Sequence, residues 1–190
     1  MNQNLSYIWE LAKIFLIALV IVAPIRYFLF QPFIVSGDSM VPSFHSGDYF
    51  IIDEISYRLG SPQRGDVIVF KYPKNPIHKF IKRIIGLPGE TVEISNDQIT
   101  IYSKDGQKEV LDEMSYLPSA KGNTFGDLKI TLSGKEYFVL GDNRAYSSDS
   151  RSWGALPADN IIGKVFIRIF PFAALNKITA PIYQFSTSGV

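Results

Sequence analysis

Ser39 is the first residue of this 190-residue chain whose setting could support covalent chemistry. It lies in the segment SGDSMVPS, residues 36–43, where Gly37 before Asp38 favours a turn and Pro42 prevents a regular central strand. An irregular segment leaves backbone amides free near the hydroxyl, which suits a nucleophile beside an oxyanion hole. By itself the segment favours the simpler interpretation, a solvated serine in a loop.

Lys82 lies in the segment KFIKRIIG, residues 79–86, which has the composition of a β-strand. Because side chains alternate between the two faces of a strand, Lys82 shares a face with Phe80 and Ile84, while Arg83 points the other way. Bulky apolar neighbours desolvate a lysine and lower its pKa, so that the neutral amine can act as a general base. Alone, the segment favours the alternative of an edge-strand lysine that prevents aggregation.

The third candidate is the polar segment GDNRAYSSDSRSWG, residues 141–154, which follows an apolar run at 137–140. Its aspartates, arginines and serines can hydrogen-bond to one another, and its glycines and asparagine favour turns. The segment predicts either a hydrogen-bonded loop that frames a site or an ordinary polar hairpin loop.

Other catalytic chemistries have less support. The chain has no cysteine and only two histidines, His45 and His78, which excludes thiol chemistry and leaves too few ligands for most His-rich metal sites. A Ser-His-Asp triad through either histidine is not excluded, but no HExxH, P-loop, dinucleotide-binding or EF-hand pattern is present. We expect no metal and no cofactor. The formal net charge of +1 gives no electrostatic argument for nucleic acid as a partner.

The N-terminal segment, residues 1–35, is poor in charge, with only Glu10, Lys13 and Arg26. Residues 8–30, as a helix rising about 1.5 Å per residue, would reach about 34 Å, which suits a hydrocarbon core about 30 Å thick. The segment therefore predicts a single transmembrane anchor at about 8–30. A buried core helix and a cleaved signal peptide are the alternatives. Against the second, no basic region precedes the apolar run and no A-x-A site closes it.

Short runs rich in Val, Ile, Phe and Tyr follow, separated by Gly, Pro, Asn and Asp. They predict that residues 36–190 form a mainly β, antiparallel domain of coiled-sheet or barrel-like form. Short helices are expected near 53–59 and 173–178. The more polar stretch 103–131 predicts a small insertion between core strands.

Four segments behind the apolar helix resemble, in this order, those of the type I signal peptidases. These are membrane-anchored serine proteases with a Ser-Lys dyad that remove signal peptides from exported proteins. The segments are GDSMVPS at 37–43, RGDVIVF at 64–70, IKRIIGLPGE at 81–90 and GDNRAYSSDSRSWG at 141–154. The resemblance implies a largely β catalytic domain, and signal peptides of exported preproteins and the lipid bilayer as partners. It also implies a single-pass protein of the cytoplasmic membrane, with the catalytic domain on the extracytoplasmic side.

The resemblance also implies roles for individual residues. Ser39 matches the nucleophile, Lys82 the general base, and Ser147 a serine that hydrogen-bonds the lysine. Met40 matches the residue that follows the nucleophile and helps to shape the substrate cleft. Asp149 and Arg151 match one ion pair that supports the site in the family, and Asp142 and Arg83 match a second one.

Two positions depart from the pattern of the family. Some members have a serine two positions before the nucleophile, where its hydroxyl helps to form the oxyanion hole. Gly37 occupies that position here, so the hole must use backbone amides, chiefly that of Ser39, or another donor. An aspartate commonly follows the arginine of the GDNR sequence, and Ala145 stands there instead.

Two alternatives to a signal peptidase stay open at this point. The self-cleaving repressors of the same Ser-Lys clan share the dyad, but they need a DNA-binding helix-turn-helix where this chain has an apolar helix. A catalytically inactive, membrane-anchored β domain that binds exported proteins is the other, although every dyad position is filled here.

Overall fold

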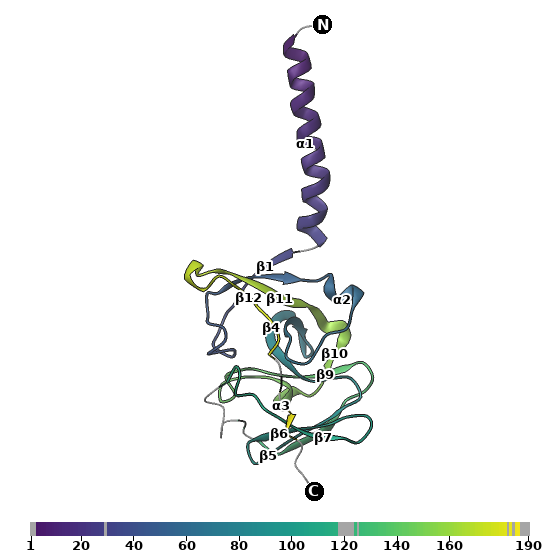
Figure 1. Ribbon diagram of the computed structural model, residues 1–190, viewed down its shortest axis with the longest axis vertical. Coiled ribbons are helices and arrows are strands. Elements are labelled where there is room, and N and C mark those ends of the chain that lie inside the picture. Colours follow the sequence, from purple (N-terminus) through teal and green to yellow (C-terminus); the bar gives the residue numbers. More distant parts are fainter. Residues whose placement is uncertain are drawn as a thin grey trace.

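The computed structural model describes residues 3–28, 30–117, 124, 126–181, 183 and 185–186. Helix α1, Gln3–Phe28, projects from one end of a β-rich body (Figure 1). Within this described part of the chain, no helix is long and apolar enough to cross a membrane. The anchor predicted at about 8–30 falls partly outside the described residues, because residue 29 and the side chains of residues 21–30 are not among them.

The larger sheet of the body has eight strands, and every pairing in it is antiparallel. Their order is β1-β2-β11-β3-β4-β9-β10, with β12 paired to β11. The strands are β1 Phe30–Ile34, β2 Tyr49–Asp53, β3 Val67–Tyr72, β4 Asn75–Gly86, β9 Glu136–Leu140, β10 Leu156–Pro157, β11 Ile161–Phe170 and β12 Asn176–Lys177. The prediction of a mainly β, antiparallel domain is confirmed. Strand β4 lies between β3 and β9, so the alternative of an edge-strand lysine at Lys82 is wrong.

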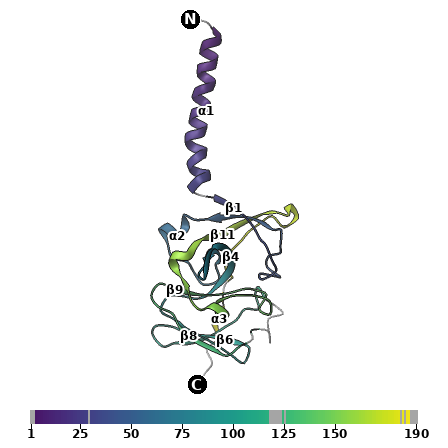
Figure 2. The ribbon, with the colours of Figure 1, turned by 180° about the vertical axis from the view of Figure 1, so that it is seen from behind.

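A second, five-stranded antiparallel sheet lies at the end of the body far from α1, as Figures 1 and 2 both show. Its strands, in spatial order, are β13 Phe185–Ser186, β7 Lys108–Leu111, β6 Gln98–Tyr102, β5 Thr91–Ser95 and β8 Leu128–Thr131. The insertion predicted at 103–131 contains β7 and β8, but β5 and β6 belong to the same sheet and precede it. Strand β2 of the larger sheet alternates in burial as β5 and β6 of the second sheet do, so alternation alone does not mark this border. Residues 118–123 and 125 of the predicted insertion lie outside the described part of the chain.

Of the two short helices expected from the sequence, the structure has only one. Helix α2, Ser56–Leu59, agrees with the helix expected near 53–59. The helix expected near 173–178 is wrong, because one 3₁₀ turn, η2 at Phe172–Ala174, is followed directly by strand β12. A second 3₁₀ turn, η1 at Ala158–Asn160, precedes β11. Helix α3, Ser150–Trp153, was not expected, and Asp149 caps it by accepting a hydrogen bond from the backbone amide of Arg151.

The C-terminal half of strand β4 is enclosed by the hydrophobic core. Its last six residues are all buried. Ile81, Ile84 and Ile85 belong to three different clusters of the core. Lys82 and Arg83 lie between them, so both cations are held in a strand that has protein on each face.

Candidate active site

The segment around Ser39 is an irregular turn that the core holds in place. Gly37 has a φ of 93°, a left-handed conformation that a side chain would disfavour. The amide of Val41 donates to the carbonyl of Asp38 at 3.2 Å, and the amide of Phe44 donates to that of Met40 at 2.9 Å. The sequence predicted this irregular backbone from the same glycine and from the following proline.

Lys82 brings its ammonium group to the hydroxyl of Ser39, although the two residues are 43 positions apart. The Nζ–Oγ distance is 2.6 Å, and Nζ also donates to the carbonyl of Ile81 at 2.9 Å. Lys82 is 3% exposed, and its Nζ lies 5.5 Å from the ring centroid of Phe80. Burial lowers the pKa of Lys82 to about 8, although the charges of Asp149 and Asp142 oppose that shift.

The polar segment 141–154 is a loop that is hydrogen-bonded to the nucleophile segment. The backbone amide of Asn143 donates to the carbonyl of Ser39 at 3.0 Å, and its side-chain amide donates to the carbonyl of Asp38 at 3.0 Å. A Cβ on Gly141 would collide with the carbonyl of Ser39 and with the hydroxyl of Ser147. The glycine is therefore needed for the close approach of the two segments, and the alternative of an ordinary hairpin loop is wrong.

Ser147 does not make the hydrogen bond that the resemblance implies. Its Oγ is buried and has no hydrogen-bond partner among the described residues. The described hydrogen bonds of Lys82 Nζ go to Ser39 and to the carbonyl of Ile81. Ser147 is nevertheless packed against Gly141 at the site, so its role stays a prediction.

Asp149 and Arg151 form the first of the two expected ion pairs. Arg151 Nε and Nη2 donate to the two carboxylate oxygens of Asp149 at 2.8 and 2.9 Å. Asp149 also accepts from the backbone amide of Gly141 at 3.1 Å, and Arg151 Nη2 donates to the carbonyl of Arg144 at 2.7 Å. The pair thus fixes both ends of the loop that holds Ser147.

Arg83 and Asp142 form the second expected pair on the opposite face of β4 from Lys82. Arg83 Nε and Nη2 donate to the two oxygens of Asp142 at 2.9 and 2.7 Å. Arg83 Nη1 donates to the carbonyl of Gly65 at 3.0 Å. Two parallel hydrogen bonds between planar groups fix the geometry as well as the charge.

The cleft beside the dyad has a volume of about 300 Å³. It is lined by residues of β1, the nucleophile segment, β4 and the loop, namely Phe33, Ile34, Ser36, Gly37, Asp38, Ser39, Lys79, Phe80, Ile81, Lys82, Tyr146 and Ser148. A larger cavity of about 630 Å³ is lined by Arg83 and Arg168 but by neither Ser39 nor Lys82. We take the smaller cleft as the candidate site because it holds the groups that can react.

Met40 is not among the residues that line this cleft, and its part in shaping the substrate cleft stays a prediction. Its side chain is 0% exposed and belongs to the core cluster that contains Phe44 and Phe50. The turn at Ser39 points successive side chains in opposite directions, so that the hydroxyl faces the cleft while Met40 anchors the turn from below.

The sequence did not reveal one buried ion pair at the site, between Arg144 and Glu113. Arg144 donates to the two carboxylate oxygens of Glu113 at 2.6 and 2.7 Å and to Thr124 Oγ1 at 2.8 Å. Glu113 lies 31 positions before Arg144, in the predicted insertion, and no local signal connects the two. Among the residues described, no group of three or more His, Asp or Glu side chains could hold a metal ion.

A serine hydroxyl bonded to a buried lysine is the arrangement of serine peptidases whose general base is a lysine. Comparison with known proteins gives the family. Residues 8–170 match the family model described as signal peptidase, peptidase S26. The chain belongs to this family, and the resemblance to the type I signal peptidases is confirmed.

Individual relatives agree with the family model over most of the chain. "Probable signal peptidase I-1" of Synechocystis is 36% identical and covers 93% of this chain and 92% of its own length. "Signal peptidase I" of Bacillus amyloliquefaciens is 38% identical over 89% of both chains. A crystal structure of a signal peptidase I from Enterococcus faecalis is 37% identical, covers 56% of this chain and 97% of its own, and has a TM-score of 0.48.

Proposed function

We propose that the chain is a membrane-anchored endopeptidase that cleaves signal peptides from exported preproteins with a Ser39–Lys82 dyad. The observation that carries the proposal is the 2.6 Å contact between Lys82 Nζ and Ser39 Oγ at a lysine that is 3% exposed. The relatives named signal peptidase I support the substrate class.

In the proposed mechanism, neutral Lys82 accepts the proton of Ser39 as Oγ attacks the carbonyl carbon of the scissile peptide bond. The negative charge that develops on the carbonyl oxygen is stabilised by the backbone amide of Ser39, to which no described contact is assigned. Protonated Lys82 then gives its proton to the leaving amine, and an acyl-enzyme is left. Lys82 next takes a proton from water, which attacks the ester and releases the signal peptide with regeneration of Ser39.

The charges around Lys82 are arranged so that its neutral form is accessible. Asp142 and Asp149 are the two carboxylates that favour the ammonium form of Lys82. Each is already paired with an arginine, Asp142 with Arg83 and Asp149 with Arg151. Because each pair is close to neutral, desolvation outweighs the remaining attraction, and the pKa of the lysine falls.

Part of the cleft can accept apolar side chains next to the scissile bond. Phe33, Ile34, Phe80 and Ile81 contribute apolar surface to a volume of about 300 Å³. A charged side chain would lose its hydration against this part of the lining. The lining therefore favours apolar over charged residues there, and the preference for small residues at positions −1 and −3 follows from the family resemblance.

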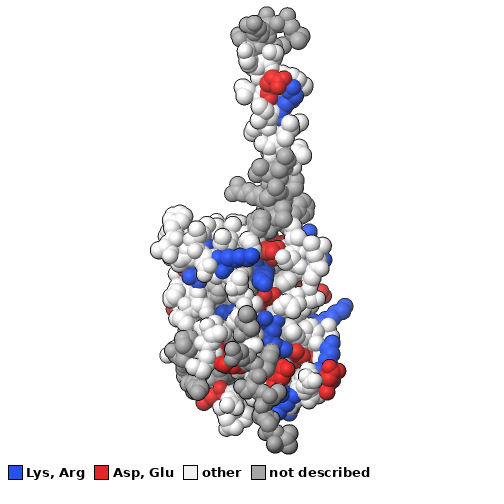
Figure 3. Space-filling model, viewed as in Figure 1, with Lys and Arg blue, Asp and Glu red and all other residues white. Residues whose placement is uncertain are grey.

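We also propose that α1 anchors the enzyme in the lipid bilayer, with its N-terminus in the cytoplasm and the catalytic body outside. The apolar side chains of α1 from Ile14 to Val20 are exposed. The charged patch visible on the helix is the Glu10–Lys13 pair (Figure 3). A helix that is apolar on all sides is stable in a protein core or in lipid. The 14–30 run contains a single charge, at Arg26.

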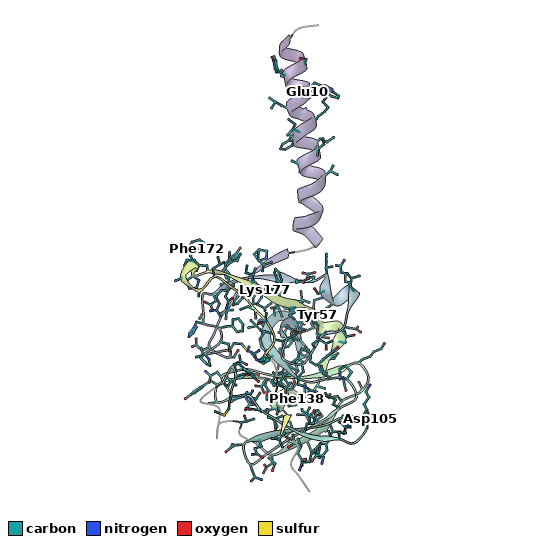
Figure 4. All side chains as sticks on the ribbon, viewed as in Figure 1. Glu10, Tyr57, Asp105, Phe138, Phe172 and Lys177 are labelled. Atoms are coloured by element: carbon teal, nitrogen blue, oxygen red, sulfur yellow. The ribbon has the colours of Figure 1, made fainter. Side chains whose placement is uncertain are left out.

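The end of the body that faces α1 carries further exposed apolar side chains. Ile34, Phe170, Phe172 and Leu175 are each more than half exposed. Figure 4 places Phe172 at the end of the body from which α1 emerges. Contact of this end with lipid would hold the cleft, which Ile34 also lines, close to the membrane surface where a signal peptide ends.

The test is cleavage of a purified preprotein by the full-length chain in lipid vesicles, with the products identified by mass spectrometry. We expect cleavage after the signal peptide, and its loss in Ser39→Ala and in Lys82→Ala. Ser61→Ala and Lys71→Ala, which change exposed residues outside the cleft, are the matched controls. Binding of the preprotein without cleavage would favour the inactive binding domain, and cleavage of the chain itself without cleavage of the preprotein would favour the self-cleaving alternative.

A further inference from the structure

The turn that follows β7 reaches from the second sheet to the catalytic loop. Glu113 begins this turn, and its carboxylate accepts one hydrogen bond from Arg144 Nη1 and one from Arg144 Nη2. The side chains of Arg144 and Glu113 are 1% and 9% exposed. A buried, bidentate pair of this kind fixes the position of the guanidinium group closely.

Arg144 in turn holds the loop that grips the nucleophile. Its Nε donates to the carbonyl of Gly141 at 2.9 Å, and its own carbonyl accepts from Arg151 Nη2 at 2.7 Å. The adjacent residue, Asn143, makes the two hydrogen bonds to the carbonyls of Ser39 and Asp38. A displacement of Arg144 would therefore move the backbone that carries the nucleophile.

A second contact of the same turn reaches the residue beside the general base. The hydroxyl of Tyr116 donates to Glu113, and its ring lies 4.1 Å from the guanidinium carbon of Arg83. Arg83 follows Lys82 in β4 and is paired with Asp142. The turn at Glu113–Tyr116 thus contacts two arginines near the dyad. Arg83 is the residue after Lys82, and Arg144 is the residue after Asn143, which is hydrogen-bonded to Ser39.

We propose that Glu113 is a positioning residue for the Ser39–Lys82 dyad and that it acts through Arg144. Without the carboxylate, Arg144 would be a buried charge with no hydrogen-bonded carboxylate, and it would be drawn away from Gly141 toward solvent. Asn143 would move with it and change the position of Ser39 relative to Lys82. This gives the second sheet a part in the turnover of an enzyme whose cleft it does not line.

The experiment is a kinetic comparison of Glu113→Gln with Glu93→Gln, and it rests on the proposed cleavage of preproteins. Both variants change a glutamate to glutamine, Glu113 in the turn after β7 and Glu93 in β5, where Glu93 forms an exposed pair with Lys129. Turnover is normalised to the folded enzyme, which is measured from the thermal unfolding curve of each variant. We expect kcat of Glu113→Gln to fall at least about tenfold with KM within about twofold of wild type, and Glu93→Gln to match wild type.

Two further variants separate positioning from general support of the fold. Glu113→Asp keeps the carboxylate and is expected to recover part of the lost kcat. The double variant Glu113→Gln/Arg144→Gln is expected to lose no more kcat than the worse single variant, because both changes act through one linkage. Wild-type kcat in folded Glu113→Gln, or fully additive losses in the double variant, would overturn the proposal.

The positioning role can also be examined without catalysis, which keeps it distinct from the proposed function. We expect the backbone amide of Asn143, which is bonded to the carbonyl of Ser39, to exchange its hydrogen faster in Glu113→Gln and at the wild-type rate in Glu93→Gln. Unchanged exchange would contradict the positioning role even if the wild-type chain cleaved no preprotein. Failure of wild-type cleavage with the expected exchange pattern would overturn only the proposed function.

Discussion

The two faces of β4 hold two neighbouring basic residues that are equally buried but have different hydrogen-bond partners. Lys82 and Arg83 are each 3% exposed. Arg83 has a bidentate carboxylate partner in Asp142, whereas the described hydrogen bonds of Lys82 go to a hydroxyl and a carbonyl. Burial alone therefore does not determine whether a basic side chain stays protonated. A carboxylate partner keeps the group cationic, and without one the group can lose its proton and act as a base.

The largest effect is expected from a change that keeps the charge of Lys82 but removes its ability to be neutral. Lys82→Arg places a guanidinium group, whose pKa is too high for a base, where an amine is needed. We expect kcat for preprotein cleavage to fall by at least about 10³-fold, while the variant stays folded. Activity above about a tenth of wild type in that assay would show that Lys82 is not the base.

Breaking the pair on the other face should affect stability first. Asp142→Asn leaves Arg83 buried with no anionic partner, which is expected to lower the free energy of unfolding by about 3–5 kcal/mol. Loss of the Asp142 charge also removes one of the causes that raise the pKa of Lys82, so the pH profile of the remaining activity should move to lower pH. Denaturant unfolding measures the first effect, and a profile displaced to higher pH would contradict the second.

Removing Lys82, the cation without a carboxylate partner, should stabilise the fold, in contrast to removing the carboxylate partner of Arg83. The pKa of Lys82 is about 8 in the folded chain and 10.5 ordinarily, so the unfolded chain binds more protons between these values and wild-type stability rises with pH across that window. Lys82→Met is expected to be more stable than wild type at pH 7, by about 3 kcal/mol at most. The difference should shrink as the pH approaches 10.5, and equal stability at pH 7 would count against the depressed pKa.

The smallest effect is expected for an ion pair at the surface of the second sheet. Lys129 and Glu93 lie 3.4 Å apart on the second sheet, and the lysine side chain is 58% exposed. Exposed pairs of this kind contribute little because solvent screens them. Lys129→Gln should leave both the unfolding midpoint and preprotein cleavage unchanged, and a clear loss of either would mean that exposed pairs in this sheet also matter.

The parts of the site that local pattern encodes could be predicted from the sequence. The period of two in residues 79–86 placed Lys82 and Arg83 on opposite faces of a strand, and Gly37 predicted the turn before Ser39. The resemblance to the type I signal peptidases paired Asp142 with Arg83 and Asp149 with Arg151, and both pairs are present.

The parts that depend on tertiary packing could not be predicted. The Glu113–Arg144 pair joins residues 31 positions apart, one in the turn after β7 and one in the loop after β9, and no local signal connects the two. The inward direction of Met40 depends on the core beneath the turn, and the border of the second sheet depends on which strands pair. The hydrogen bond expected between Ser147 and Lys82 depends on how the loop packs against the site, which no motif specifies.

The central claim is that burial without a carboxylate partner makes Lys82 a neutral base, and the pH dependence of kcat/KM tests it most directly. This quantity reports the ionisation of the free enzyme. The account predicts that kcat/KM for preprotein cleavage rises with pH through a single midpoint near the Lys82 pKa of about 8. A profile that is flat between pH 6 and 10, or that rises only near 10.5, the ordinary pKa of a lysine, would contradict it.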